Sequence, residues 1–151
     1  MASPGYYTIL IVEDNTSLLA FLKLAMEQLG NFTVIAAPDG ITGLELAVTL
    51  RPACVVIDVK MPGLDGYQLV QALRGDPATA TIPLLIMTAL AQDKDRFTGM
   101  AAGADLYMTK PVMPQDLAAA IQQIISTSEA ERVARLKQLA EITHDAKRDG
   151  E

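Results

Sequence analysis

The stretch Ala53-Cys54-Val55-Val56-Ile57-Asp58 carries the clearest structural signal in the chain. Its apolar residues do not alternate with polar ones, which is typical of a strand covered on both faces in a parallel sheet. The runs Thr8–Val12 and Leu84–Met87 have the same character. These three runs predict an α/β protein with a buried parallel sheet.

Strand-like runs and helix-like segments alternate five times along the chain. The expected strands are Tyr7–Val12, Phe32–Ala36, Ala53–Ile57, Ile82–Met87 and Asp105–Thr109. This alternation predicts a three-layer sandwich with right-handed crossovers. Five such units fit a flavodoxin-like, doubly wound parallel sheet in the order 2-1-3-4-5, with five flanking helices.

Local signals mark where helices begin. Asn15 and Asp39 each stand just before an apolar pattern of helical period and are expected N-caps. Further helices are expected from about Tyr67 to Arg74, over Asp93–Ala102 and over Gln115–Ile125.

The composition changes after Ile125, so we expect a domain over residues 1–125 and a helical extension with a frayed end over 126–151. Residues 129–145 have apolar side chains at helical spacing and predict a short amphipathic helix that continues the fifth helix or is hinged at the serines before it. It could dock on its own domain, pair with a second copy, or be a truncated linker.

Charge and composition exclude several protein classes. The 151 residues carry a net charge of −6, which argues against a nucleic-acid or anionic-membrane binder. One cysteine and one histidine exclude an internal disulfide framework and a Cys/His zinc site. We find neither a signal peptide nor a run long enough to span a bilayer, so we expect a soluble cytoplasmic protein.

Polar residues stand where four of the expected strands end. They are Glu13 and Asp14 after the first strand, Asp58 after the third, Thr88 after the fourth and Lys110 after the fifth. Each alone fits a turn, a cap or a solvated surface. Because the carboxyl ends of parallel strands meet at one edge of a sheet, together they predict a shared site.

The residue types at this edge suggest phosphoryl chemistry. Crowded carboxylates repel one another unless a cation lies between them, and an open all-oxygen site suits Mg²⁺. A lysine and a hydroxyl nearby are suited to binding phosphoryl oxygens. Asp58 is then a candidate nucleophile that forms an acyl phosphate.

Five stretches together resemble the receiver domain of two-component response regulators, the CheY-like domains, across residues 6–125. They are Ile9–Asn15, Val55–Tyr67, Ile86–Ala89, Gly103–Asp105 and Lys110-Pro111. Any one is a weak motif, whereas all five in order and at compatible spacing are highly specific.

The resemblance implies a role for each position. Asp58 would be the phosphoacceptor, and Thr88 and Lys110 would bind phosphoryl oxygens. Asp14, Asp58 and the backbone carbonyl of Lys60 would hold Mg²⁺, with Glu13 contributing directly or through water. Lys110-Pro111 matches a cis peptide of the family.

Tyr107 matches the aromatic switch residue of the family. It would turn inward when Thr88 is drawn toward the phosphoryl group, and so reshape the face of the fourth helix, fifth strand and fifth helix. The alternative is an ordinary half-buried strand tyrosine.

The implied function is a phosphoacceptor in signal transduction rather than an enzyme. The phosphoryl donor would be a histidine kinase or a histidine phosphotransfer protein, and the output a downstream protein target, with homodimerisation possible. Residues 126–151 are too few for a DNA-binding domain and mix acidic with basic side chains. A single-domain regulator or phosphorelay intermediate is expected; the alternative is the isolated receiver of a longer regulator.

Three rivals come from other classes. A Mg²⁺-dependent phosphohydrolase with an aspartyl-phosphate intermediate would want a second acid two residues after Asp58, where this chain has Lys60. A flavodoxin-like cofactor binder would need a phosphate-cradling loop where the chain has Glu13-Asp14-Asn15. A receiver that has lost phosphorylation would not need Asp58, Thr88 and Lys110 together.

Overall fold

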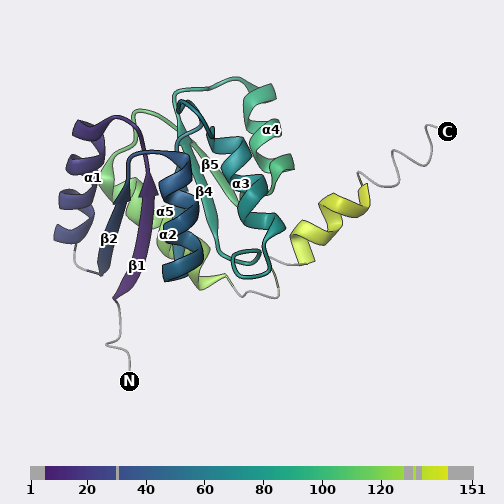
Figure 1. Cartoon of the computed structure of the whole chain (residues 1–151), viewed down its shortest axis with the longest axis horizontal. Coiled ribbons are helices and arrows are strands. Elements are labelled where there is room, and N and C mark those ends of the chain that lie inside the picture. Colours follow the sequence, from purple (N-terminus) through teal and green to yellow (C-terminus); the bar gives the residue numbers. More distant parts are fainter. Residues whose placement is uncertain (1–5, 30, 128–130, 132–133, 143–151) are drawn as a thin grey trace.

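A computed structural model describes residues 6–29, 31–127, 131 and 134–142. Its centre is a five-stranded parallel sheet in the order β2-β1-β3-β4-β5 (Figure 1). The strands are β1 (Tyr7–Val12), β2 (Phe32–Ala37), β3 (Cys54–Ile57), β4 (Leu84–Thr88) and β5 (Leu106–Thr109). The predicted doubly wound order is therefore confirmed.

Helices cover both faces of the sheet (Figure 1). They are α1 (Thr16–Gln28), α2 (Gly40–Leu50), α3 (Gly66–Gly75), α4 (Asp93–Ala102) and α5 (Pro114–Ser126). Helices α1 and α5 pack together on one face, whereas α3 contacts both α2 and α4 on the other. This arrangement is the predicted three-layer sandwich.

Successive residues of the central strands point to opposite faces and so fill two cores. Ile9 and Ile11 of β1 pack with α1 and α5, whereas Leu10 and Val12 pack with α2 and α3. All four are at most 1% exposed. The lack of alternation along these strands follows, since neither face is open to water.

The N-caps expected at Asn15 and Asp39 are confirmed. The Asn15 side chain accepts a hydrogen bond from the Leu18 N–H at 3.1 Å, and the Asp39 carboxylate accepts one from the Thr42 N–H at 2.7 Å. These bonds satisfy backbone donors that have no partner within the helix. They start α1 and α2 immediately after β1 and β2.

Some element boundaries differ from the sequence-based expectation. Strand β4 begins at Leu84 rather than Ile82, because the Ile82 N–H is bonded to the Thr79 carbonyl in a turn and Pro83 has no N–H. The strand also extends to Thr88, which pairs with Thr109 of β5. Helix α5 ends at Ser126 because Thr127 has extended backbone angles, so the following helix does not continue it.

Residues 134–142 form the further helix expected from the apolar spacing, and residues 143–151 lie outside the described part of the chain. Its Leu136 and Leu139, together with Phe97 and Met100 of α4, line an open cleft of about 690 Å³. Leu139 remains 40% exposed and Phe97 74% exposed. The helix therefore lies near α4 without closing over it.

Among the described residues, none of the helices has the length and apolar character that a bilayer crossing requires.

Candidate functional site

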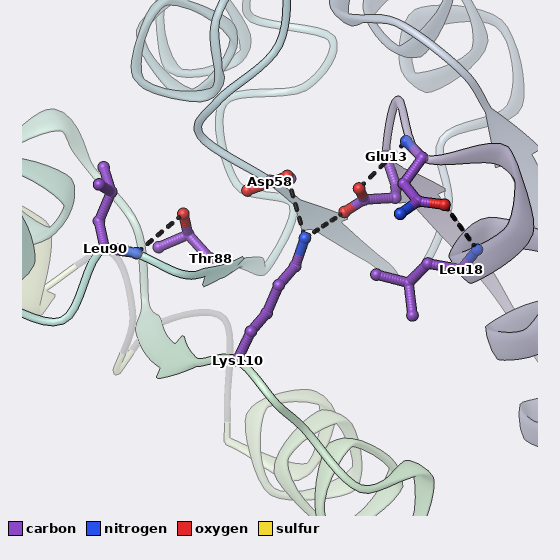
Figure 2. Close-up of polar contacts among 7 residues, drawn as sticks. Glu13, Leu18, Asp58, Thr88, Leu90 and Lys110 are labelled. Atoms are coloured by element: carbon purple, nitrogen blue, oxygen red, sulfur yellow. Dashed lines mark hydrogen bonds and ion pairs between the residues drawn. The ribbon is translucent and has the colours of Figure 1, made fainter.

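Four strands bring the predicted site residues to one edge of the sheet (Figure 2). Glu13 follows β1, Asp58 follows β3, Thr88 ends β4, and Lys110 follows β5. Glu13, Asp58 and Thr88 are at most 5% exposed, so their polar groups lie in a recess rather than on an open surface. The prediction that distant strand ends converge is borne out in the geometry.

Lys110 connects the two buried carboxylates. Its ammonium donates to Glu13 Oε2 at 2.8 Å and to Asp58 Oδ2 at 3.1 Å (Figure 2). These contacts join positions 97 and 52 residues apart in the sequence. The preceding backbone helps to place the lysine, because the Lys110 N–H bonds to the Thr88 carbonyl at 2.8 Å.

The pKa values in this cluster reflect burial and charge crowding. Burial raises the pKa of Glu13, the Lys110 ammonium opposes that rise, and the charge of Asp58 adds to it. For Lys110, burial by itself lowers the pKa, but hydrogen bonds to Glu13 and Asp58 outweigh it and raise the pKa overall. The lysine therefore stays protonated at neutral pH, as a group that binds anionic oxygens must.

A candidate cation site lies beside the lysine. Carboxylate oxygens of Glu13, Asp14 and Asp58 lie within 4.8 Å of one another. Asp14 is exposed and opens this cluster to solvent, while Glu13 is held by a hydrogen bond from the Asn15 N–H at 3.2 Å. A set of oxygen donors open on one side fits Mg²⁺, which keeps several of its waters.

The loop after β3 is drawn tightly against the start of α3. The Gly66 N–H donates to the Val59 carbonyl at 2.9 Å, and a Cβ on Gly66 would lie 2.6 Å from Val59 Cα. Only glycine fits there without a backbone shift. The close approach positions the loop that contains Lys60, whose side chain is exposed.

Thr88 and Tyr107 lie on the far side of Asp58 from Glu13. The buried Thr88 Oγ1 accepts a hydrogen bond from the Leu90 N–H at 3.4 Å (Figure 2). Tyr107 is 4% exposed, and its hydroxyl donates to the Leu90 carbonyl at 2.7 Å. The loop after β4 therefore contacts both expected switch residues, and Tyr107 is buried rather than half-buried.

The peptide bond between Lys110 and Pro111 is cis, as the resemblance implied.

Two residues near Tyr107 have no place in the sequence-based site. Tyr67 of α3 reaches the first turn of α4, where its hydroxyl donates to the Asp95 carbonyl at 3.1 Å. Gly99 of α4 faces the Tyr107 ring. Neither could be found from spacing, because the first contact joins α3 to α4 and the second joins α4 to β5.

Comparison with known proteins supports one family. The family model described as the response regulator receiver domain matches residues 9–122. A Synechocystis protein named DNA-binding dual master transcriptional regulator RpaA is 38% identical over 117 residues, covering 78% of this chain and 48% of the relative. The alkaline phosphatase synthesis transcriptional regulatory protein PhoP of Bacillus subtilis is 37% identical over 121 residues, covering 80% and 49%.

Solved structures give the same result. A putative response regulator from Chloroflexus aurantiacus is 33% identical with a TM-score of 0.75, covering 80% of this chain and 98% of that one. The receiver domain of a sensor histidine kinase from Pseudomonas aeruginosa is 29% identical with a TM-score of 0.74, at the same coverage. That structure is described with a magnesium ion coordinated in its active-site cleft. The present chain spans about half the length of the curated relatives it matches.

Proposed function

Because this chain belongs to the response regulator receiver domain family, we propose that Asp58 is its phosphoacceptor. The observation that carries the proposal is the placement of the Lys110 ammonium, 3.1 Å from Asp58 Oδ2 and 2.8 Å from Glu13 Oε2. A buried carboxylate with a cation aimed at it, at the carboxyl edge of a parallel sheet, is suited to nucleophilic attack on a phosphoryl group.

The transfer forms one bond and breaks one. An oxygen of the ionised Asp58 carboxylate bonds to phosphorus, and the bond from phosphorus to the donor breaks, so the donor leaves with that electron pair. With acetyl phosphate the leaving group is acetate, and with a phosphohistidine it is the imidazole. Lys110 and Thr88 would bind the phosphoryl oxygens, exchanging their present contacts for new ones.

The proposed cation ligands are Asp14, Asp58 and the backbone carbonyl of Lys60, with Glu13 direct or through water. The clustering of the three carboxylates supports this assignment. Bound Mg²⁺ supplies positive charge that offsets the carboxylates and the incoming phosphoryl group.

Phosphorylation would act through Thr88 and Tyr107 on the surface formed by α4, β5 and α5. A phosphoryl group adds about −1.5 to −2 charges and strong acceptor oxygens. Thr88 would turn toward these oxygens and release the Leu90 N–H that it now contacts. Since Tyr107 is bound to the Leu90 carbonyl, a change in this loop reaches β5 and α4 directly.

Response regulators act with histidine kinases and downstream targets, and we place this chain in such a pathway in the cytoplasm. Its donor would be a histidine kinase or a histidine phosphotransfer protein, and its target another protein or a second copy. Its own chemistry would be limited to phosphorylation and dephosphorylation of Asp58. Residues 1–125 would be the receiver and 126–151 a helical extension.

Two forms of the whole protein fit these features. The chain acts as a single-domain regulator or phosphorelay intermediate, or it is the receiver of a longer regulator. The second form is favoured by relatives about twice as long that are named as transcriptional regulators.

Intact-mass measurement after incubation with Mg²⁺ and acetyl phosphate tests the proposal. We expect one phosphoryl adduct per chain, absent in Asp58→Asn and retained in Asp93→Asn. Asp93 is a matched control because it is an exposed aspartate in the first turn of α4 and is not one of the three clustered carboxylates.

An adduct that persists in Asp58→Asn would contradict the assignment of the acceptor. Repeated turnover of unrelated phosphate esters would instead favour a phosphohydrolase. The exposed Lys60, at the position where such an enzyme would want a second acid, argues against that outcome.

A further inference from the structure

The helix of residues 134–142 faces α4 across an apolar cleft. Leu136, Leu139 and Ile142 line the cleft from this helix, and Phe97 lines it from α4. The three residues of the first set are spaced three apart, so they lie on one side of the helix. Two apolar surfaces therefore face each other with open space between them.

The exposure of these side chains increases along the helix. Leu136 is half-buried, Leu139 is 40% exposed and Ile142 is 67% exposed. Near its start, Arg135 lines a small pocket of about 90 Å³ together with Thr127, which directly follows α5. The helix therefore begins beside the end of α5, while its last turn leaves apolar side chains open to water.

Closing the cleft would bury no unmatched charge. Among the described residues that line it, Arg74 alone is charged, and its guanidinium is already bonded to Asp105 and to three backbone carbonyls. Lys137 and Glu141 of the helix are exposed and are not among the lining residues. Apolar surface can thus leave water here without stranding a polar group.

The apolar side chains that closure would cover are unusually exposed. Phe97, at 74%, and Ile142, at 67%, are the two most exposed large apolar side chains in the described part of the chain. Both line the same cleft. A helix of about this length is marginal in water by itself and is normally stabilised by packing of its apolar side. One movement would bury both side chains and stabilise the helix.

The helix is attached close to the surface that it faces. Leu136 follows Thr127 by nine residues, so the helix stays near α4 at any protein concentration. A short tether of this kind gives an effective concentration in roughly the millimolar range. A contact made by so few turns is small for two separate chains, which normally bury about 800 Å² on each side. The segment best placed to fill the cleft is therefore the chain's own helix.

We propose that the helix of residues 134–142 is an intramolecular cover for α4, which closes so that Leu139 and Ile142 pack against Phe97. Closure removes Phe97 from the surface that α4 offers to other proteins. It requires neither phosphorylation nor Mg²⁺, so it does not depend on the function proposed above. Its consequence for signalling does rest on that function: a target that binds α4 would have to displace this helix.

Tryptophan fluorescence of the full chain tests the closure. The chain has no tryptophan, so Phe97→Trp places a single indole on α4. Closure should give emission at short wavelength and weak quenching by acrylamide. Adding Leu139→Lys should shift the emission to longer wavelength and strengthen quenching, because loss of one large apolar contact should lower the closed-to-open ratio about tenfold. Lysine has nearly the helix propensity of leucine, so the helix itself should remain.

Gln138→Lys is the matched control. It introduces the same side chain at an exposed position of the same helix that is not among the lining residues of the cleft. Combined with Phe97→Trp, it should leave both the emission and the quenching unchanged.

Amide hydrogen exchange tests the same contact from the other side, without an indole. Phe97→Ala should speed the exchange of the amides of residues 136–142 by up to about tenfold, because a helix that packs less often opens more often. Phe21→Ala, which removes an aromatic ring that is 55% exposed on α1, is the control and should not change this exchange.

The inference is overturned if Leu139→Lys and Gln138→Lys give the same emission, or if Phe97→Ala leaves the exchange of residues 136–142 unchanged. A second copy of the chain could fill the cleft instead. In that case the emission would change with protein concentration and a sizing column would show a dimer, which would equally overturn intramolecular closure.

Discussion

Two buried clusters of acidic and basic side chains lie at different places in this fold, and they are built differently. In one, Arg74 of α3 is bonded to Asp105 at 2.8 Å and to the backbone carbonyls of Gly103, Ala80 and Ile82. In the other, Lys110 lies between Glu13 and Asp58, with Asp14 close by.

The Arg74–Asp105 cluster is balanced. Among the described residues its ion pair joins one cation to one anion, and the Asp105 carboxylate also accepts a hydrogen bond from the Leu84 N–H at 2.8 Å. The guanidinium donates to three carbonyls in two loops, the one before β4 and the one before β5. Such a cluster joins the end of α3 to the start of β4 and β5.

The Lys110 cluster is unbalanced. Three carboxylates face one ammonium, and burial already raises the pKa of Glu13. A cluster with excess negative charge gains by taking up a cation or by losing a carboxylate. The comparison teaches that a buried ion pair indicates function when its charges are left uncompensated, and architecture when they are matched.

The largest expected effect is on the balanced cluster. Asp105→Ala removes the carboxylate that the buried Arg74 guanidinium contacts and should lower the free energy of unfolding by about 3–5 kcal/mol. Urea unfolding measures this. Glu45→Ala, at an exposed position of α2, is the control and should change stability by no more than about 0.5 kcal/mol. If Asp105→Ala lowered the free energy of unfolding no more than Glu45→Ala does, the balanced cluster would not have the structural role that separates it from the Lys110 cluster.

Magnesium should act on the unbalanced cluster alone. At a hundred times its dissociation constant, Mg²⁺ should raise the free energy of unfolding by about 2.7 kcal/mol relative to EDTA. The increment should disappear in Asp14→Asn. It should persist in a variant of the balanced cluster, such as Arg74→Lys, measured in the same urea titrations. Equal stabilisation of Asp14→Asn would place the ion elsewhere.

Removing a carboxylate from the unbalanced cluster should lower the stability of the protein only slightly. Asp58→Asn loses one bond to Lys110 but relieves repulsion with Glu13, so without Mg²⁺ its free energy of unfolding should stay within about 1 kcal/mol of the unmodified protein or rise above it. Chemical unfolding in EDTA checks this. A loss comparable to that of Asp105→Ala would mean that the two clusters are not different in kind.

The smallest expected effect on stability concerns Asp39, which belongs to neither cluster. Its carboxylate accepts hydrogen bonds from the backbone N–H and the hydroxyl of Thr42. Hydrogen bonds from the Thr42 N–H and then the Thr42 hydroxyl lower its pKa below the usual 3.8. It therefore contributes stability above pH 3.8 that is lost as pH falls through the lowered pKa. Unfolding measured between neutral pH and about pH 3 should show a shallower acid-side slope in Asp39→Asn, which keeps an acceptor but does not titrate. An identical slope would contradict this.

Much of the fold was predictable because its signals are local. The unbroken apolar runs in β1, β3 and β4 follow from burial of both sheet faces, and the caps at Asn15 and Asp39 follow from the backbone donors at a helix start. The boundaries were less predictable. Strand β5 begins at Leu106 rather than Asp105, whose side chain and N–H are both bonded to Leu84 of the neighbouring strand.

The candidate site also has parts that the sequence could identify and parts that it could not. Glu13, Asp14, Asp58, Thr88 and Lys110 could be named from sequence because each directly follows or ends a strand, and strand ends of a parallel sheet share one edge. The contact of the Tyr67 hydroxyl with the Asp95 carbonyl could not, since it depends on how α3 and α4 pack together. The Arg74–Asp105 pair, 31 residues apart, has no local signal at position 74.

By itself, the sequence determined the α/β architecture, the strand order expected for it and the identity of the groups at the carboxyl edge. These depend on periodicity, capping and chain direction, which neighbouring residues specify. Only the tertiary structure decided that Lys110 contacts both Glu13 and Asp58, that the Tyr107 hydroxyl is bonded to the Leu90 carbonyl, and that Arg74 is paired with Asp105. Such contacts depend on distances between separate elements, and these are set by packing of the whole core.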